Sequence, residues 1–160
     1  MHRALVVILI LTTAILALGV GGFSQDVVDN LSEGRSLGVG IQIGFPWGGL
    51  ISTRYWFDSS TAVEGIFFAW KERSDYTGVI TGRVLYKISD RPTVDFYVVG
   101  GATLPFSSYG TQTAIFSAAG GIEFNLAFAR NLALNVEFGG AMSSEGSFIM
   151  EIGSGIHFYF

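Results

Sequence analysis

The sequence predicts an all-β protein, an eight-stranded antiparallel up-and-down transmembrane β-barrel. Three observations lead to this fold class. From about residue 36 to the last residue, apolar side chains alternate with small or polar ones, which is the two-residue period of a strand. Apolar residues make up 49% of the chain and charged residues only 14%, a balance that suits strands crossing a bilayer. Many of the 22 glycines share the strand face that carries the charges, as a narrow barrel interior requires.

The N-terminal part of the chain predicts export. Residues 1–3 supply a positive charge, residues 4–18 are apolar apart from two threonines, and small residues follow. This is the layout of a secretory signal peptide, with cleavage expected after Ser24 or, alternatively, after Gly19. An uncleaved anchor is the other interpretation, because residues 4–23 are about long enough to span a bilayer. The predicted organisation is a signal peptide over 1–24, a short periplasmic lead-in over 25–35 and one barrel domain over 36–160.

Eight segments of the barrel domain follow the period of a strand. They are separated by Gly, Pro, Asp, Ser and Asn, the residues that favour turns. None of them shows the helical spacing of apolar residues, and strands do not alternate with helices. The expected strands are 37–45, 50–57, 62–70, 78–88, 93–102, 113–124, 131–140 and 147–160.

The longest connections are expected after the third and the fifth strand. Residues 71–77 are mostly polar or charged, and residues 103–112 are rich in aromatic and hydroxyl side chains. If the N-terminus lies in the periplasm, both loops face the outside of the cell, as the longer loops of such barrels do. The other two outward connections, 46–49 and 143–146, are short, which argues against a binding role that needs long loops.

The two faces of the expected strands differ in polarity. One face is mostly Leu, Val, Ile, Phe and Tyr, and the other carries glycines, small polar residues and charges. We expect the polar face to point inward, because opposite charges across a narrow lumen offset each other's burial. A soluble lipocalin-like barrel would have the opposite arrangement, but its exterior would not need the glycines. The predicted lumen charge network consists of Arg54, Glu64, Arg83, Lys87, Asp95, Glu123, Glu137 and Glu151.

The last segment, SFIMEIGSGIHFYF, ends on an aromatic residue with apolar residues at almost every second position before it. It resembles the C-terminal strand of bacterial outer-membrane β-barrels, although Ser154 stands where a larger apolar residue is usual. Residues 36–160 resemble the small barrels of the OmpA/OmpX type. The resemblance implies a monomer in the outer-membrane lipid of a diderm bacterium. It also implies recognition by the barrel-assembly machinery through a C-terminal signal, for which we name Ile152, Ile156, Phe158 and Phe160.

The motifs of other functional classes are missing from the sequence. His157 is the only histidine after the predicted signal peptide, has no His-x-Ser pattern around it, and is expected to form hydrogen bonds in the lumen. The carboxylates are scattered over different strands without metal-ligand spacing, and no phosphate-binding loop occurs. A net charge of −4 without a basic cluster argues against nucleic acid. We therefore predict no enzyme activity, no catalytic residue, no metal and no cofactor.

The predicted function is a structural or envelope-associated role. Eight-stranded lumens are normally filled by side chains, so we expect a narrow, charge-lined and plugged interior. A small porin-like channel is the alternative, and a soluble lipid-binding barrel is the third interpretation.

Overall fold

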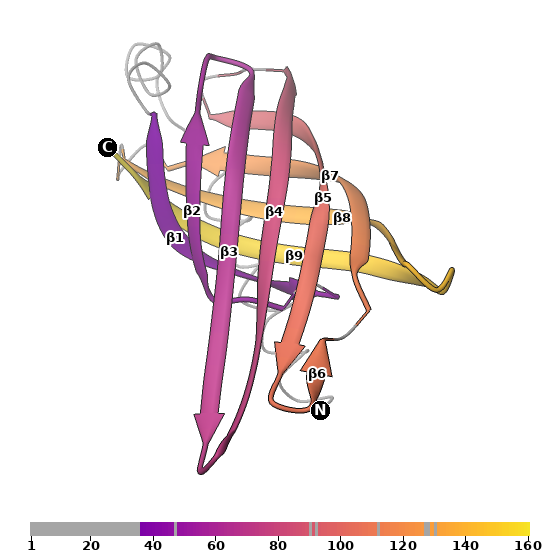
Figure 1. Ribbon diagram of the computed structural model, residues 1–160. Coiled ribbons are helices and arrows are strands. Elements are labelled where there is room, and N and C mark those ends of the chain that lie inside the picture. Colours follow the sequence, from indigo (N-terminus) through magenta and orange to yellow (C-terminus); the bar gives the residue numbers. More distant parts are fainter. Residues whose placement is uncertain are drawn as a thin grey trace, which may run out of the picture.

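The computed structural model describes residues 36–160 except residues 47, 90, 92, 112, 127, 128 and 130. The predicted signal peptide and lead-in, residues 1–24 and 25–35, lie outside the described residues. The described part of the chain consists of strands and the turns that join them (Figure 1). The strands are β1 (Leu37–Phe45), β2 (Ile51–Trp56), β3 (Thr61–Glu72), β4 (Asp75–Ser89), β5 (Val94–Ser107), β6 (Gly110–Thr111), β7 (Ile115–Asn125), β8 (Leu132–Ser143) and β9 (Phe148–Tyr159).

Eight of these strands close into an antiparallel barrel. Each long strand pairs with the next long strand along the chain, and β1 pairs with β9 from Gly38↔Tyr159 to Phe45↔Ile152. This last pairing joins the first strand to the final one, so the wall has no open edge along its body. The two-residue strand β6 pairs only with the end of β5 and is an addition to the wall. The prediction of an eight-stranded antiparallel barrel is confirmed.

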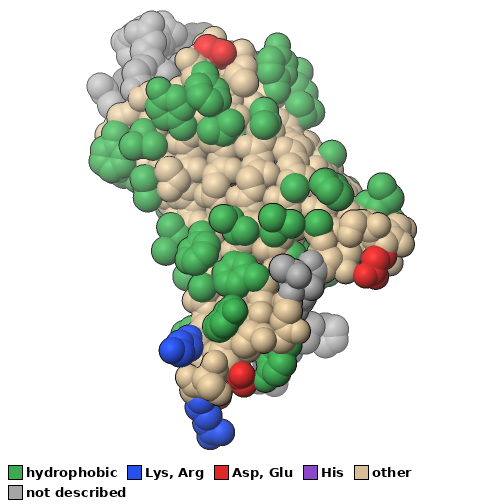
Figure 2. Space-filling view, viewed as in Figure 1, with side chains coloured by type: hydrophobic (Ala, Val, Ile, Leu, Met, Phe, Trp, Pro, Cys, Tyr) green, Lys and Arg blue, Asp and Glu red, His purple; other side chains and the backbone are tan. Residues whose placement is uncertain are grey.

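The barrel wall is apolar outside and polar inside. In β2, for example, Ser52 and Arg54 are buried, whereas Ile51 and Tyr55 are 58% and 46% exposed. The same alternation runs through the other barrel strands, and large apolar side chains cover much of the visible outer surface (Figure 2). A soluble protein places such side chains in its interior, so this wall has the reverse of the usual arrangement.

Two connections differ from the sequence-based expectation. Residues 71–77 are not a loop, because β3 continues to Glu72, β4 begins at Asp75, and the two pair with each other. The loop predicted over 103–112 is strand over most of its described residues, because β5 continues to Ser107, still paired with β4, and a short turn leads into β6. Strands pair through their backbone and do not need alternating apolar residues. The extensions carry charged and hydroxyl side chains instead, so the polarity pattern did not predict them as strands.

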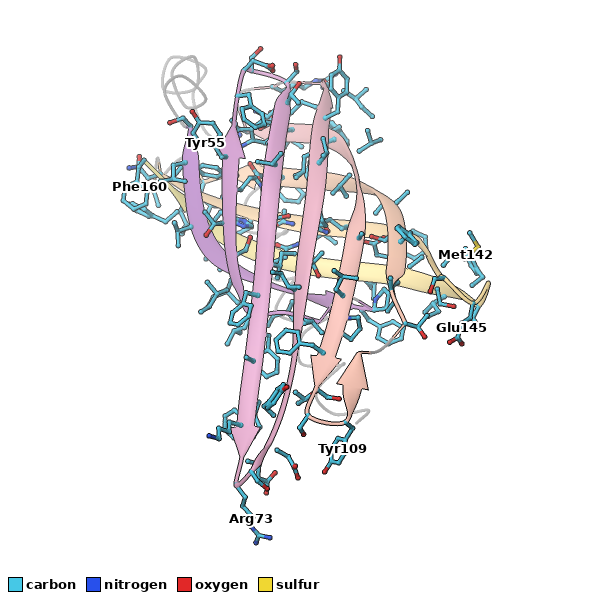
Figure 3. The ribbon with its side chains drawn as sticks, in the orientation of Figure 1. Tyr55, Arg73, Tyr109, Met142, Glu145 and Phe160 are labelled. Atoms are coloured by element: carbon cyan, nitrogen blue, oxygen red, sulfur yellow. The ribbon has the colours of Figure 1, made fainter. Side chains whose placement is uncertain are left out.

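The extended hairpins β3–β4 and β5–β6 stand at one end of the barrel, which we call the hairpin end. Figure 3 shows Arg73 and Tyr109 at their tips, while Phe160 lies at the opposite, C-terminal end. Asp75 ties the two hairpins together, because its carboxylate accepts a hydrogen bond of 2.8 Å from the Tyr109 hydroxyl. This hydrogen bond raises the pKa of Tyr109, since deprotonation would place two negative charges side by side.

No helix among the described residues has the length and apolar character needed to cross a membrane.

Candidate functional site

The structure places all eight residues of the predicted lumen charge network on the inner face of the barrel. They come from β2, β3, β4, β5, β7, β8 and β9, so nearly every strand of the wall contributes. Arg54 and Glu151 have no exposed surface, and the others are buried too, except Lys87, whose side chain keeps 12% exposure. Charges buried in this way need partners of the opposite sign.

Glu64 is at the centre of the network. Its carboxylate forms salt bridges to Arg54, at 3.2 Å, and to Arg83 on the neighbouring strand. Arg54 also reaches across the barrel to Glu123, and Arg83 reaches Glu137 at 2.5 Å. Five side chains from five strands are therefore joined into one cluster of alternating charge that crosses the lumen.

The remaining predicted charges lie on either side of this cluster. Glu151 Oε1 lies 3.8 Å from Arg83 Nη1, on the side of the hairpin end. Toward the C-terminal end, Lys87 Nζ lies 3.2 Å from Asp95 and 4.5 Å from the centre of the Trp56 ring. Charged and aromatic side chains thus fill the lumen toward the C-terminal end as well.

Two tyrosines complete the cluster. The Tyr97 hydroxyl donates to Glu137 at 2.7 Å, and the Tyr159 hydroxyl donates to Glu123 at 3.1 Å. Glycines opposite them provide the space. A Cβ at Gly121 would stand 2.2 Å from the Tyr97 ring, and one at Gly38 would stand 2.6 Å from the Tyr159 ring. These inward glycines have the role that the sequence predicted for this face.

His157 meets a serine and a carboxylate inside the barrel. Its Nε2 lies 2.9 Å from Ser52 Oγ and 3.1 Å from Glu64 Oε1, and Ser52 donates its own hydrogen bond to Glu64 at 2.7 Å. A catalytic triad needs the acid on the other ring nitrogen, where it orients the imidazole toward the serine. Here both partners share one nitrogen, and all three side chains are buried. The trio therefore has the geometry of a packed polar core.

Several residues of this core were not predicted as part of the site from the sequence. They share the inward parity of the charges, which is the signal that could have found them. They are Gln42, Ser52, Trp56, Tyr97, Asn125, Asn135 and Tyr159.

The four residues named as the C-terminal signal lie on the outer face of β9 or directly after that strand. Ile152, Ile156 and Phe158 point outward from β9 and are 55%, 37% and 44% exposed. Phe160 follows the strand, is 65% exposed, and packs edge to face against Phe158 with ring centroids 5.1 Å apart. They lie on the outer face of the strand that closes the barrel or directly after it, with the half-buried Ser154 between Ile152 and Ile156.

No group of three or more His, Cys, Asp or Glu side chains is arranged to hold a metal ion in the part of the chain that the structure describes. The closed antiparallel wall, its apolar outer surface and its charged core together define the class: a small β-barrel whose polarity is inverted.

Comparisons with known proteins add little to this description. No protein-family model matches the chain, and no curated protein sequence matches it. Among solved structures the chain is similar to the crystal structure of Ail, the attachment invasion locus protein of Yersinia pestis. The two share 14% sequence identity, the alignment covers 78% of this chain and 97% of that chain, and the TM-score is 0.45. The fold assignment therefore rests on the strand pairing of this chain itself.

Proposed function

We propose that this protein is an integral protein of the bacterial outer membrane, with a structural role in the envelope and a lumen closed by its own side chains. The inverted polarity of the wall carries this proposal. Phe67, Ile80 and Ile152 are each about half exposed on the outer surface, while Arg54 and Glu64 are enclosed. Exposure of the first group to water is unfavourable, whereas the hydrocarbon of a lipid bilayer accepts apolar side chains. The closed barrel can lie in that hydrocarbon because its strands pair their backbone groups with one another.

The distribution of aromatic residues supports a membrane position. Near the hairpin end, Phe67 stacks on Phe106 with ring centroids 6.4 Å apart. Near the C-terminal end, Tyr55 and Phe57 pack edge to face at 5.3 Å. Between the two groups the outer wall carries exposed glycines such as Gly82. Two aromatic belts on either side of an apolar middle are typical of proteins that span a bilayer.

The filled lumen favours a structural role over transport. The cluster around Glu64 joins strands on opposite sides of the barrel, so a passing solute would have to break several buried ion pairs. A small porin-like channel is the second candidate, because the same interior is polar. Recordings in planar bilayers distinguish the two, since a structural barrel gives no steady conductance and a channel does.

The C-terminal strand supports a route of assembly. The exposed apolar residues Ile152, Ile156, Phe158 and Phe160 lie on β9 or directly after it, and β9 is also the strand that must pair with β1 to close the wall. We propose that the barrel-assembly machinery binds this strand and that the finished barrel is a monomer in outer-membrane lipid.

Gel mobility in detergent, with and without boiling, tests the proposed membrane barrel. A closed membrane barrel resists the detergent and migrates as a compact species until it is boiled. The expected result is a boiling-dependent shift, together with the circular dichroism of β-structure. A protein that is soluble in plain buffer and shows no shift would contradict the proposal and would point to a lipid-binding barrel instead.

A further inference from the structure

Acidic side chains outnumber basic ones in the buried centre of the barrel. Lys87 and Asp95 neutralise each other near the C-terminal end, at 3.2 Å. The described charges that remain inside are two arginines and four glutamates, which leave two negative charges in excess. They are Arg54, Arg83, Glu64, Glu123, Glu137 and Glu151. An uncompensated charge in a low-dielectric interior is costly, so this region attracts positive charge.

Beside this region, Gln42 lies in the interior with an unused amide. The side chain has no exposed surface, and neither its oxygen nor its nitrogen has a hydrogen-bond partner among the described residues. Its Oε1 lies over Gly155, 1.7 Å from the point where a Cβ of that residue would stand. A buried amide normally has hydrogen-bond partners, so an enclosed group without one indicates that something else binds it.

Asn135 directs a second oxygen to the same point. Its Nδ2 donates to the Tyr97 hydroxyl at 3.1 Å and to Glu137 Oε1 at 3.2 Å. Turning this amide around would set its oxygen against the Glu137 carboxylate, so the network fixes its orientation. The Asn135 Oδ1 then lies 2.6 Å from the Cβ point of Gly155, where no described group donates to it.

These two oxygens are close enough to share one ligand. At 1.7 Å and 2.6 Å from a common point, they lie no more than 4.3 Å apart. Hard metal cations take carbonyl oxygens at about 2.3–2.6 Å, so one ion between them can contact both. A Cβ at position 155 would occupy the space of the Gln42 oxygen, so a larger residue there would displace that side chain.

We propose that the barrel core binds one small hard cation, Na⁺ or Ca²⁺, between Gln42 Oε1 and Asn135 Oδ1, over Gly155. The ion offsets part or all of the excess negative charge that the nearby glutamates bring into the interior. It ties β1, β8 and β9 together at the seam where the chain closes its barrel. The site follows from the interior of the fold and does not depend on the role proposed for the protein in the envelope.

Unfolding in the presence of different cations tests this site. The protein, folded in detergent micelles, is unfolded with urea at fixed pH and ionic strength, in NaCl, in CaCl₂ or in N-methyl-D-glucamine chloride, whose cation is too large for the site. Above the dissociation constant, each tenfold rise in the free concentration of the ion that binds should lower the unfolding equilibrium constant up to tenfold. Gln42→Leu should abolish this response. Thr81→Val should retain it, because Thr81 is similarly buried but its hydroxyl lies against that of Thr103, at 2.9 Å, and not at the proposed site.

Direct ion binding is measured on the unmodified protein, in case Gln42→Leu does not fold. Equilibrium dialysis against radioactive sodium or calcium should find one bound ion per barrel. The ion that is retained shows whether the site binds Na⁺ or Ca²⁺. Identical unfolding curves in all three salts, with no bound ion, would overturn the proposal. In that case the Gln42 amide is turned so that its nitrogen donates to Asn135 Oδ1. Unfolding that depends on pH and on no cation would overturn the proposal as well.

Discussion

Arg83 gives the sharpest test of the charged core. It contacts Glu64 and Glu137 directly, and Glu151 at 3.8 Å, and its side chain has no exposed surface. Arg83→Met keeps a long unbranched side chain but removes the charge, so these carboxylates are left buried with one cation fewer. Breaking a buried ion pair by removing one partner typically costs about 3–5 kcal/mol. The unfolding equilibrium constant should then rise roughly a hundredfold to several thousandfold.

Urea unfolding in micelles measures this loss through the fluorescence of the tryptophans. Two comparisons separate the cause from a general effect of the substitution. Arg73→Met, at the exposed tip of the β3–β4 hairpin, should change the free energy of unfolding by no more than about 0.5 kcal/mol. Adding Glu137→Gln to Arg83→Met should restore part of the loss, because it removes one of the unpaired charges. A loss below about 1 kcal/mol for Arg83→Met, or no recovery in the double variant, would refute the view that this network holds the barrel together.

Three further predictions follow from particular positions. Gly121→Ala should destabilise the barrel by about 1–3 kcal/mol, because its Cβ would stand 2.2 Å from the Tyr97 ring. Gly120→Ala is the control: a Cβ there would meet nothing within 4 Å, so the urea midpoint of unfolding should change little. Deletion of Phe160 should reduce insertion into the outer membrane, as followed by cell fractionation, while Phe160→Trp should insert normally; normal insertion of the deletion would remove the argument for a C-terminal signal. Hydrogen bonds from Ser60 and from the backbone of residue 61 lower the pKa of Asp58 below its ordinary 3.8. Its stabilising effect should therefore be present at neutral pH and lost as the pH falls below that ordinary value, so Asp58→Ala and the parent should differ in urea midpoint at pH 7 and converge in acid.

The two-residue period was enough to predict the strands and their inner face, because a strand places alternate residues on opposite sides whatever its neighbours are. Adjacent pairings such as Arg54↔Glu64 and Glu64↔Arg83 are also local, since they join consecutive strands. The contact between Arg54 and Glu123, 69 residues apart, could not be predicted in this way. It depends on how far the strands are staggered around the barrel, and that stagger is set by the register of every hairpin together. The meeting of Ser52 with His157 was missed for the same reason.

The hairpin extensions were missed for a different reason. Residues 71–77 lack apolar alternation because neither face of the β3–β4 tip is enclosed by the barrel, and Lys71, Arg73 and Tyr76 are all exposed. A strand shows alternating polarity where one of its faces is buried and the other is not. Where that burial ends, pairing continues through the backbone alone, and the sequence looks like a loop.

The charged core also fixes the register of the strands, which an apolar outer wall alone would leave poorly specified. If both faces of these strands were apolar, a shift of one residue in register would cost little, because lipid accepts either face. With Arg54, Glu64 and Glu137 on one face, the same shift would expose charges to hydrocarbon and would separate the ion pairs that now join opposite walls. Buried ion pairs contribute little net stability compared with a well-packed apolar core, but they penalise wrong registers strongly. The network around Glu64 therefore has its largest effect on specificity: it makes one closed arrangement of eight strands far more favourable than its neighbours.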